Sequence, residues 1–224
     1  MKIYYHPVST TSRPLMLFAQ ENALPVEFQV VDLMKGEHVQ PPYEKINPSK
    51  LVPVLEDGDF RLTESSAILK YLADKVSSPA YPKDLKQRAK VNEMMDWLNT
   101  QFYREYGYGF IYPQIFPNNK RPSDAAQKAC LEWSKERAQN WMKLLDQHWI
   151  GPKNQYLCGN QVTIADYLGA SYVTLGEIVR CDFSPYPNIQ RWLANMRKLK
   201  SWPKVNEVFE GYKASVKDQQ FAAL

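Results

Sequence analysis

The sequence predicts a small α/β domain followed by an all-helical domain. Two observations carry this prediction. Residues 1–75 alternate between short β-prone runs and helical segments, in the order β-α-β and then β-β-α. Beyond residue 80 the chain shows long helical periodicity and requires no strand. The stretch 77–82 contains two serines and two prolines, so we expect domains over 1–76 and 85–224, joined by a linker over 77–84.

The elements of the first domain follow from local patterns. Runs rich in β-branched and aromatic residues predict strands, and a proline-rich loop separates the second run from the third. The Asp57-Gly58 pair is a strong hairpin signal between the last two strands. We expect strands over 2–5, 26–31, 52–55 and 60–62, and helices over 15–22 and 64–75.

The elements of the second domain are marked by helix caps. Ser123-Asp124 marks the start of a long helix, and Gly151-Pro152 marks its end. Thr163 and Asp166 have the spacing of a capping box, in which the first side chain accepts the backbone N–H of the second residue and the second accepts that of the first. Their role is structural. We expect helices over 85–102 and 125–149, and two shorter ones over 189–199 and 203–212.

Length and composition exclude several classes of protein. The chain has 224 residues, of which 44% are apolar and 13% aromatic, so it can bury a core and is too apolar to stay disordered. It lacks both an apolar run of the roughly 18 residues that a membrane span needs and a secretory segment at its start. Its three cysteines, Cys130, Cys158 and Cys181, form no CxxC pair, so we expect a reducing compartment, the cytoplasm.

The net charge of +4 is unevenly distributed. Residues 1–78 carry 8 Lys/Arg against 10 Asp/Glu, and residues 79–224 carry 20 against 14. Two interpretations of this positive excess remain open: an ordinary solvated surface, or a mild preference for an anionic small molecule. No stretch interleaves clustered Lys and Arg with aromatic residues, so we expect no nucleic-acid partner.

Several common active sites have no support in the sequence. His6, His38 and His148 are isolated and lack the spacing of zinc ligands, so we expect no metal. No GxGxxG fingerprint, P-loop or GxSxG elbow is present. The chemistry must therefore come from another arrangement.

The segments around Val52-Pro53 and Glu64-Ser65 form a more informative pattern. Pro53 cannot donate to a strand ladder, and a cis bond before it would leave the N–H and C=O of Val52 open to an extended peptide. Ser65 opens a helix, whose free N–H groups favour a carboxylate, while Glu64 can bind an ammonium group. This pattern is that of a receptor for a γ-glutamyl group followed by a peptide backbone.

The sequence resembles the cytosolic glutathione transferases, closest to the serine-type theta and delta classes. Individually the matching motifs are weak, but their order and spacing together are specific, and they extend over nearly the whole chain. The resemblance implies a thioredoxin-like N-terminal domain, an all-α C-terminal domain, glutathione as co-substrate and a homodimer. It rests on residues 4–9, 36–38, 47–55, 62–68 and 163–167.

By this resemblance, Ser9 donates a hydrogen bond to the glutathione sulfur. It lies just after the first strand and four residues before Arg13, as the family pattern requires. The chain departs from the usual Ser-x-Pro-Cys-Arg sequence, because Thr10, Thr11 and Ser12 stand between Ser9 and Arg13. These hydroxyls compete for the role, and Ser12 is the second choice. A serine before a helix is also a common cap.

The resemblance assigns the rest of the glutathione site by position. His38 and Lys50 reach the glycine carboxylate, and Val52 and Pro53 supply the backbone clamp. The γ-glutamyl end belongs to Glu64 and Ser65.

An aromatic segment predicts where the second substrate binds. A wall of aromatic side chains suits a flat or apolar electrophile, and Arg104 could stabilise the negative charge that develops during the reaction. Core packing and a dimer surface are open alternatives for any single residue. We assign the electrophile pocket to Arg104, Tyr108 and Tyr112, within a segment that also contains Tyr106, Phe110 and Phe116.

The predicted function is therefore transfer of the glutathione thiolate to small electrophiles, apolar or aromatic in character. A thiol-disulfide enzyme that uses its own cysteine does not fit, because the first cysteine is Cys130. Two alternatives remain: a glutathione-dependent disulfide or peroxide reductase, and a non-catalytic protein that uses this fold for binding.

Overall fold

A computed structural model describes residues 1–224. The N-terminal part is a mixed four-stranded sheet in the order β2-β1-β3-β4. β1 is parallel to β2 and antiparallel to β3, and β3 and β4 form the expected hairpin. The strands are β1 (Lys2–Tyr5), β2 (Glu27–Val30), β3 (Val54–Asp57) and β4 (Phe60–Leu62).

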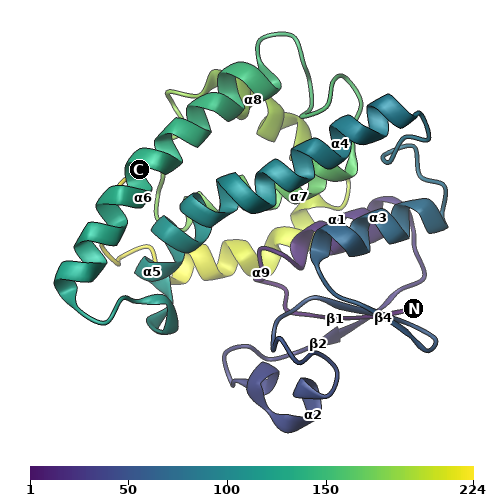
Figure 1. Cartoon of the computed structure of the whole chain (residues 1–224), viewed down its shortest axis with the longest axis horizontal. Helices are drawn as coiled ribbons and strands as arrows, with labels where there is room; N and C mark the ends of the chain where they lie inside the picture. Colours follow the sequence, from purple (N-terminus) through teal and green to yellow (C-terminus); the bar gives the residue numbers. More distant parts are fainter.

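The alternation of side chains gives the sheet two apolar faces. Ile3 and Leu55 belong to the main core, on the face covered by α1 (Arg13–Glu21) and α3 (Ser65–Lys75). Val54 belongs to a smaller cluster on the opposite face, beside α2 (Pro41–Glu44). Figure 1 shows α1 and α3 between the sheet and the helical domain.

Two boundaries near the site differ from the sequence prediction. The third strand was expected from residue 52 but begins at Val54, because Pro53 has no N–H for the ladder. The first helix was expected from residue 15 but begins at Arg13, which puts Pro14 in its first turn, where no partner for the ring nitrogen is needed.

The C-terminal part is entirely helical, apart from an isolated bridge between Tyr156 and Gly159. Short 3₁₀ turns occur at Glu37–Val39, Pro117–Asn119 and Leu175–Glu177. No helix combines the length and the apolar run that crossing a bilayer requires. The helices are α4 (Leu85–Trp97), α5 (Tyr112–Ile115), α6 (Asp124–Leu144), α7 (Ile164–Thr174), α8 (Pro187–Met196) and α9 (Trp202–Ser215).

The helix expected to end at residue 102 continues to residue 115. Two π-helical segments, Leu98–Phe102 and Arg104–Ile111, connect α4 to α5. Two glycines within this stretch permit close packing instead of ending the helix. A Cβ atom at Gly107 would lie 2.5 Å from the ring of Tyr103, and one at Gly109 would overlap Ser134 of α6.

The expected capping box starts α7. Asp166 is fully buried and accepts the backbone N–H of Thr163 at 2.7 Å. Its carboxylate also accepts the N–H groups of Leu157 and Trp192, at 2.8 and 2.9 Å. Burial raises the pKa of Asp166 to about 6, and these donors oppose that shift. The box thus fixes the helix that packs against α1 and α3.

Candidate active site

The turn between β1 and α1 carries four successive hydroxyl groups, of which two reach the surface. Thr10 and Ser12 are buried, with 3% and 0% of their surface exposed. Ser9 and Thr11 are half-buried. Ser12 accepts the N–H of His6 at 3.5 Å and has no path to a ligand through the surface. Exposure therefore separates the two candidates for contact with sulfur and favours Ser9.

The hydroxyl of Ser9 is held from both sides. Its Oγ accepts the backbone N–H of Ser12, the N-cap residue of α1, at 3.3 Å. The same Oγ lies 3.1 Å from Oγ1 of Thr11. Thr11 in turn donates to the backbone carbonyl of Val52 at 3.0 Å. These contacts join the Ser9 turn directly to the loop before β3.

The loop before β3 has only part of the open backbone that the sequence predicts: the N–H of Val52 is open, but its carbonyl is bonded. The Val52–Pro53 bond is cis, and the N–H of Val52 has no backbone partner. Its carbonyl, by contrast, already accepts the Thr11 hydroxyl, which leaves one lone pair for another donor. The preceding carbonyl, of Leu51, accepts Tyr43 and Asn47 at 2.8 Å each, so the loop is fixed on the protein side.

The start of α3 is built for an anion. Glu64 stands at the N-cap with a φ of 65° and makes no side-chain cap, so the N–H groups of the first turn stay free. A non-glycine residue rarely adopts this conformation, and such strain clusters at functional sites. The Ser65 side chain lies in the first turn and is 6% exposed, whereas Glu64 is exposed. A carboxylate fits the free N–H groups.

His38 and Lys50 lie on the segments that flank α2. Nδ1 of His38 is buried and has no hydrogen-bond partner. Lys50, with a φ of 57°, forms an ion pair with Glu44 at 3.3 Å, and its side chain is 40% exposed. The Lys50 ammonium has three donors, so it can bind a ligand carboxylate beside Glu44.

Four tyrosines of the helical domain form a cluster next to the Ser9 turn. Tyr103 stacks on Tyr172 at 4.0 Å, and the ring of Tyr108 lies 5.0 Å from that of Tyr112. The hydroxyl of Tyr112 contacts that of Tyr103 and donates to Thr10 at 3.1 Å, so the cluster reaches the Ser9 turn.

The cluster also borders the start of α3. Burial raises the pKa of Tyr172, and the neighbouring Ser65 hydroxyl opposes this shift. The negative charge of Glu64 adds to the effect of burial in raising the pKa of Tyr108. Tyr103 and Tyr172 were not identified from the sequence. The glycine four residues after Tyr103 is a signal of close packing, but nothing in the sequence links Tyr172 to this site.

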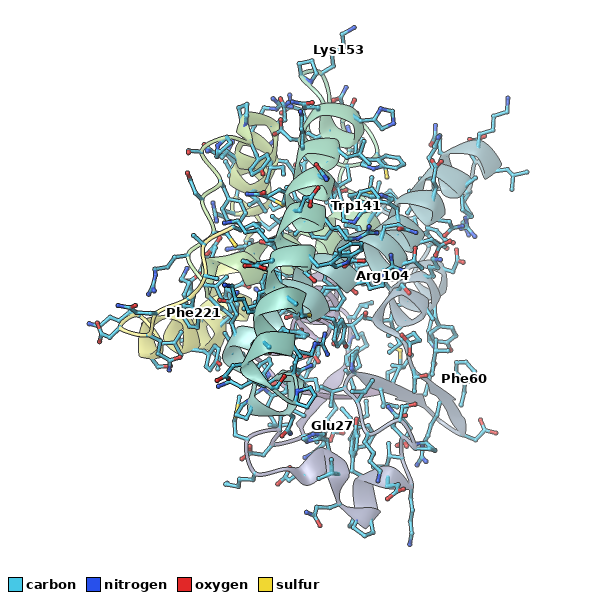
Figure 2. The ribbon with its side chains drawn as sticks, turned by 60° about the vertical axis from the view of Figure 1, so that its left-hand side comes forward. Glu27, Phe60, Arg104, Trp141, Lys153 and Phe221 are labelled. Carbon is cyan, nitrogen blue, oxygen red and sulfur yellow. The ribbon has the colours of Figure 1, made fainter.

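The remaining aromatic candidates have other roles. Tyr106 and Phe110 are fully buried, and Tyr106 donates to the carbonyl of Val173 at 2.8 Å, so the packing interpretation applies to both. Arg104 lies on the helical side of the molecule, above the sheet (Figure 2). Its exposed guanidinium is paired with Glu105 at 3.1 Å and makes no polar contact with the Ser9 turn.

No protein thiol lies near this site. All three cysteines belong to the helical domain and are unpaired. Burial raises the pKa of Cys158 and of Cys181 to about 12, so both stay protonated at neutral pH. No group of three or more His, Cys, Asp or Glu side chains is arranged to hold a metal ion. The groups at the site are hydroxyls, backbone amides and tyrosines.

Both domains of this chain match models of one protein family. The family described as glutathione S-transferase, N-terminal domain, matches residues 1–74, and its C-terminal counterpart matches residues 82–200. This chain therefore belongs to the glutathione S-transferase family, as its sequence resemblance indicated.

Within the family the chain is theta-like. It is 40% identical to glutathione S-transferase theta-1 of Homo sapiens over 195 residues, which make up 86% of this chain and 80% of that protein. A delta-class glutathione transferase of Nilaparvata lugens has a TM-score of 0.83 at 31% identity, covering 96% of this chain and 98% of that chain. Human glutathione transferase theta-2, solved with glutathione and an unknown ligand, has a TM-score of 0.85 at 26% identity, covering 100% and 93%.

Proposed function

We propose that this glutathione S-transferase binds glutathione across the Val52 loop and the start of α3, and activates its thiol at Ser9. The observation that carries the proposal is the bonded path from Ser9 through Thr11 to the carbonyl of Val52. It joins a half-buried hydroxyl to the open backbone where a peptide would pair. The human theta-2 relative was solved with glutathione, which supports the choice of ligand.

Each end of glutathione has a matching group. The N–H and C=O of Val52, oriented by Pro53, pair with the cysteinyl backbone as an added strand. Ser65 and the free N–H groups of α3 bind the γ-glutamyl carboxylate, and Glu64 binds its ammonium. Lys50 pairs with the glycine carboxylate beside Glu44, and the half-buried His38 assists.

The energy required to ionise the thiol is within the reach of Ser9. A free thiol has a pKa near 8.5, and lowering it by about two units requires roughly 2.7 kcal/mol. One hydroxyl bond to a charged acceptor supplies roughly 1.5–3 kcal/mol. The start of α1 adds a few tenths of a kcal/mol. The bond from the N–H of Ser12 uses an acceptor lone pair of Ser9 Oγ, so it does not engage the hydroxyl proton of Ser9.

The electrophile binds against the tyrosine cluster. Tyr108 is 45% exposed and offers a ring face, and Tyr112 lies between it and the Ser9 turn. Flat or apolar substrates fit such a wall. Arg104 takes part only as a peripheral positive charge. Substitution, addition and peroxide reduction all use the same thiolate.

We extend this proposal to the oligomeric state, the cellular location and the domain boundaries of the chain. The chain acts as a homodimer in the cytoplasm, with a detoxifying role. Its domains span residues 1–76 and 85–224, with a connection over 77–84. Ala80 and Tyr81 of this connection are buried, and Ala80 accepts the N–H of Ile164 at 2.9 Å, so the connection is packed against the helical domain.

The test is an ultraviolet titration of the thiolate of bound glutathione. In the unaltered protein we expect a midpoint well below the free value of about 8.5. Ser9→Ala should raise the midpoint by about one to two units, the loss of one charged hydrogen bond, while Ser12→Ala should leave it unchanged. A shift in Ser12→Ala alone would assign the role to Ser12. Saturable binding with an unshifted midpoint would indicate a carrier, and no binding would refute the glutathione assignment.

A further inference from the structure

The hydrogen-bond directions at the Ser9 turn are fixed by a simple count of protons. A carbonyl oxygen can only accept a hydrogen bond, so Thr11 donates its single hydroxyl proton to the carbonyl of Val52, 3.0 Å away. In the 3.1 Å contact between Ser9 and Thr11, the donor must then be Ser9. Without a ligand, the proton of Ser9 therefore points to Thr11.

This direction conflicts with the proposed role of Ser9. A hydroxyl has one proton, and a proton bonded to Thr11 cannot also be fully bonded to a sulfur. The cysteinyl N–H of a bound peptide would donate to the second lone pair of the Val52 carbonyl, and this bond would weaken the one that Thr11 donates to the same oxygen. A weaker bond from Thr11 to Val52 would resolve the conflict at Ser9.

We propose that Thr11 is a positioning residue, which turns the Ser9 hydroxyl toward the sulfur when a peptide N–H occupies the carbonyl of Val52. This inference rests on the proposed function and deepens it. As the peptide donates to Val52, the Thr11 proton rotates from the carbonyl to Ser9 Oγ. Ser9 then accepts two hydrogen bonds, from Ser12 and Thr11, and donates its own proton to the thiolate.

The rotation requires no movement of heavier atoms. Thr11 Oγ1 already lies within hydrogen-bond distance of both Val52 and Ser9, so only two hydroxyl protons change direction. Two donors on one oxygen polarise its O–H bond and strengthen the bond that it donates. Peptide binding and thiol activation are thereby coupled through a single side chain.

The test uses Thr11→Val, which keeps the shape and removes the hydroxyl, with Thr11→Ser as the matched control that retains it. The midpoint of the bound glutathione thiol is measured by ultraviolet titration. Loss of the supporting donor should raise the midpoint by about half a unit in Thr11→Val, and Thr11→Ser should restore it. An unchanged or lowered midpoint would overturn the proposal, because a Thr11 that only competes for the Ser9 proton would lower the midpoint when removed.

A second measurement separates positioning from structural support. S-methylglutathione has no thiol, and its affinity reports only on backbone pairing. Thr11→Val should bind it as tightly as the unaltered protein does, whereas a Thr11 that merely supports the Val52 loop would weaken binding on removal.

A double variant separates this proposal from the assignment of Ser9. In a Ser9→Ala background, Thr11→Val should cause no further shift, because Thr11 acts only through Ser9. An additive shift would overturn the coupling. If Ser9→Ala alone leaves the midpoint unchanged, the assignment of Ser9 fails. If Ser9→Ala shifts the midpoint and Thr11→Val does not, only the role of Thr11 fails.

Discussion

The two halves of the candidate site are built from different materials. The half that we propose for glutathione, here called the glutathione half, consists of backbone groups and short polar side chains, supplied by the Ser9 turn, the Val52 loop and the start of α3. The electrophile half consists of tyrosine rings from the α4–α5 segment and α7. Backbone geometry fixes the glutathione half. Side-chain packing fixes the electrophile half, so its shape can change with single substitutions.

The largest effect is expected at the junction between the two domains that carry these halves. Arg13 of α1 is fully buried and donates to the carbonyl of Ser171 and to Asn206, at 2.9 and 2.8 Å. Its guanidinium also lies 3.8 Å from the ring centre of Phe209. No acidic side chain pairs with it, and burial lowers its pKa to about 10, so it remains charged at neutral pH.

Arg13→Ala should lower the free energy of unfolding by about 3–5 kcal/mol, because it leaves a cavity and buried acceptors without a donor. Urea denaturation measures this loss. The control is Arg61→Ala, which removes an exposed ion pair with Glu56 and should cost no more than about 1 kcal/mol. Similar costs for the two variants would show that the junction contributes no more to stability than a surface pair.

A pair of variants tests whether the halves act independently. Ser65→Ala removes a hydroxyl from the glutathione half and should raise the KM for glutathione about tenfold or more. Tyr108→Ala removes an exposed ring from the electrophile half, so it should raise the KM for an aromatic electrophile several-fold and leave that for glutathione unchanged. Steady-state kinetics with each substrate varied in turn distinguishes them. If both variants changed the KM for both substrates equally, the two halves would not bind their substrates independently.

Sequence predicts the two halves unequally, for a physical reason. Val52-Pro53, Glu64-Ser65 and the capping box depend on neighbours within a few residues, so their patterns are local. Tyr172 reaches the site only through the packing of α7, and Thr11 bonds to Val52, which is 41 residues away. Such contacts follow from tertiary structure.

The errors in the predicted elements have one local and one tertiary cause. β3 begins at Val54 because Pro53 has no N–H for the ladder, which is a local effect. Gly107 and Gly109 resemble helix breakers in a local pattern, but neighbouring side chains fill the space that they leave. Tertiary packing thus carried the helix to residue 115 against the local preference.

The smallest effect is expected for the hydroxyl of Tyr112, which bonds the tyrosine cluster to the Ser9 turn. Burial raises the pKa of Tyr112 to about 12, so the phenol keeps its proton at neutral pH and can donate to Thr10 at 3.1 Å. Tyr112→Phe keeps the ring and removes this bond together with the contact to the Tyr103 hydroxyl, which should cost at least about 1 kcal/mol and lower Tm by at least about 2–4 °C. Thermal denaturation measures the shift.

Tyr108→Phe is the matched control, because the Tyr108 ring belongs to the same cluster and faces the charge of Glu64 without bonding to the turn. Its Tm should stay within about 1 °C of the unaltered protein, the usual range for a substitution that breaks no buried contact. If both variants lower Tm equally, the hydroxyl of Tyr112 contributes nothing specific. The polar contacts that hold the two domains together would then be those of Arg13 with Ser171 and Asn206 and of Glu21 with Ser201.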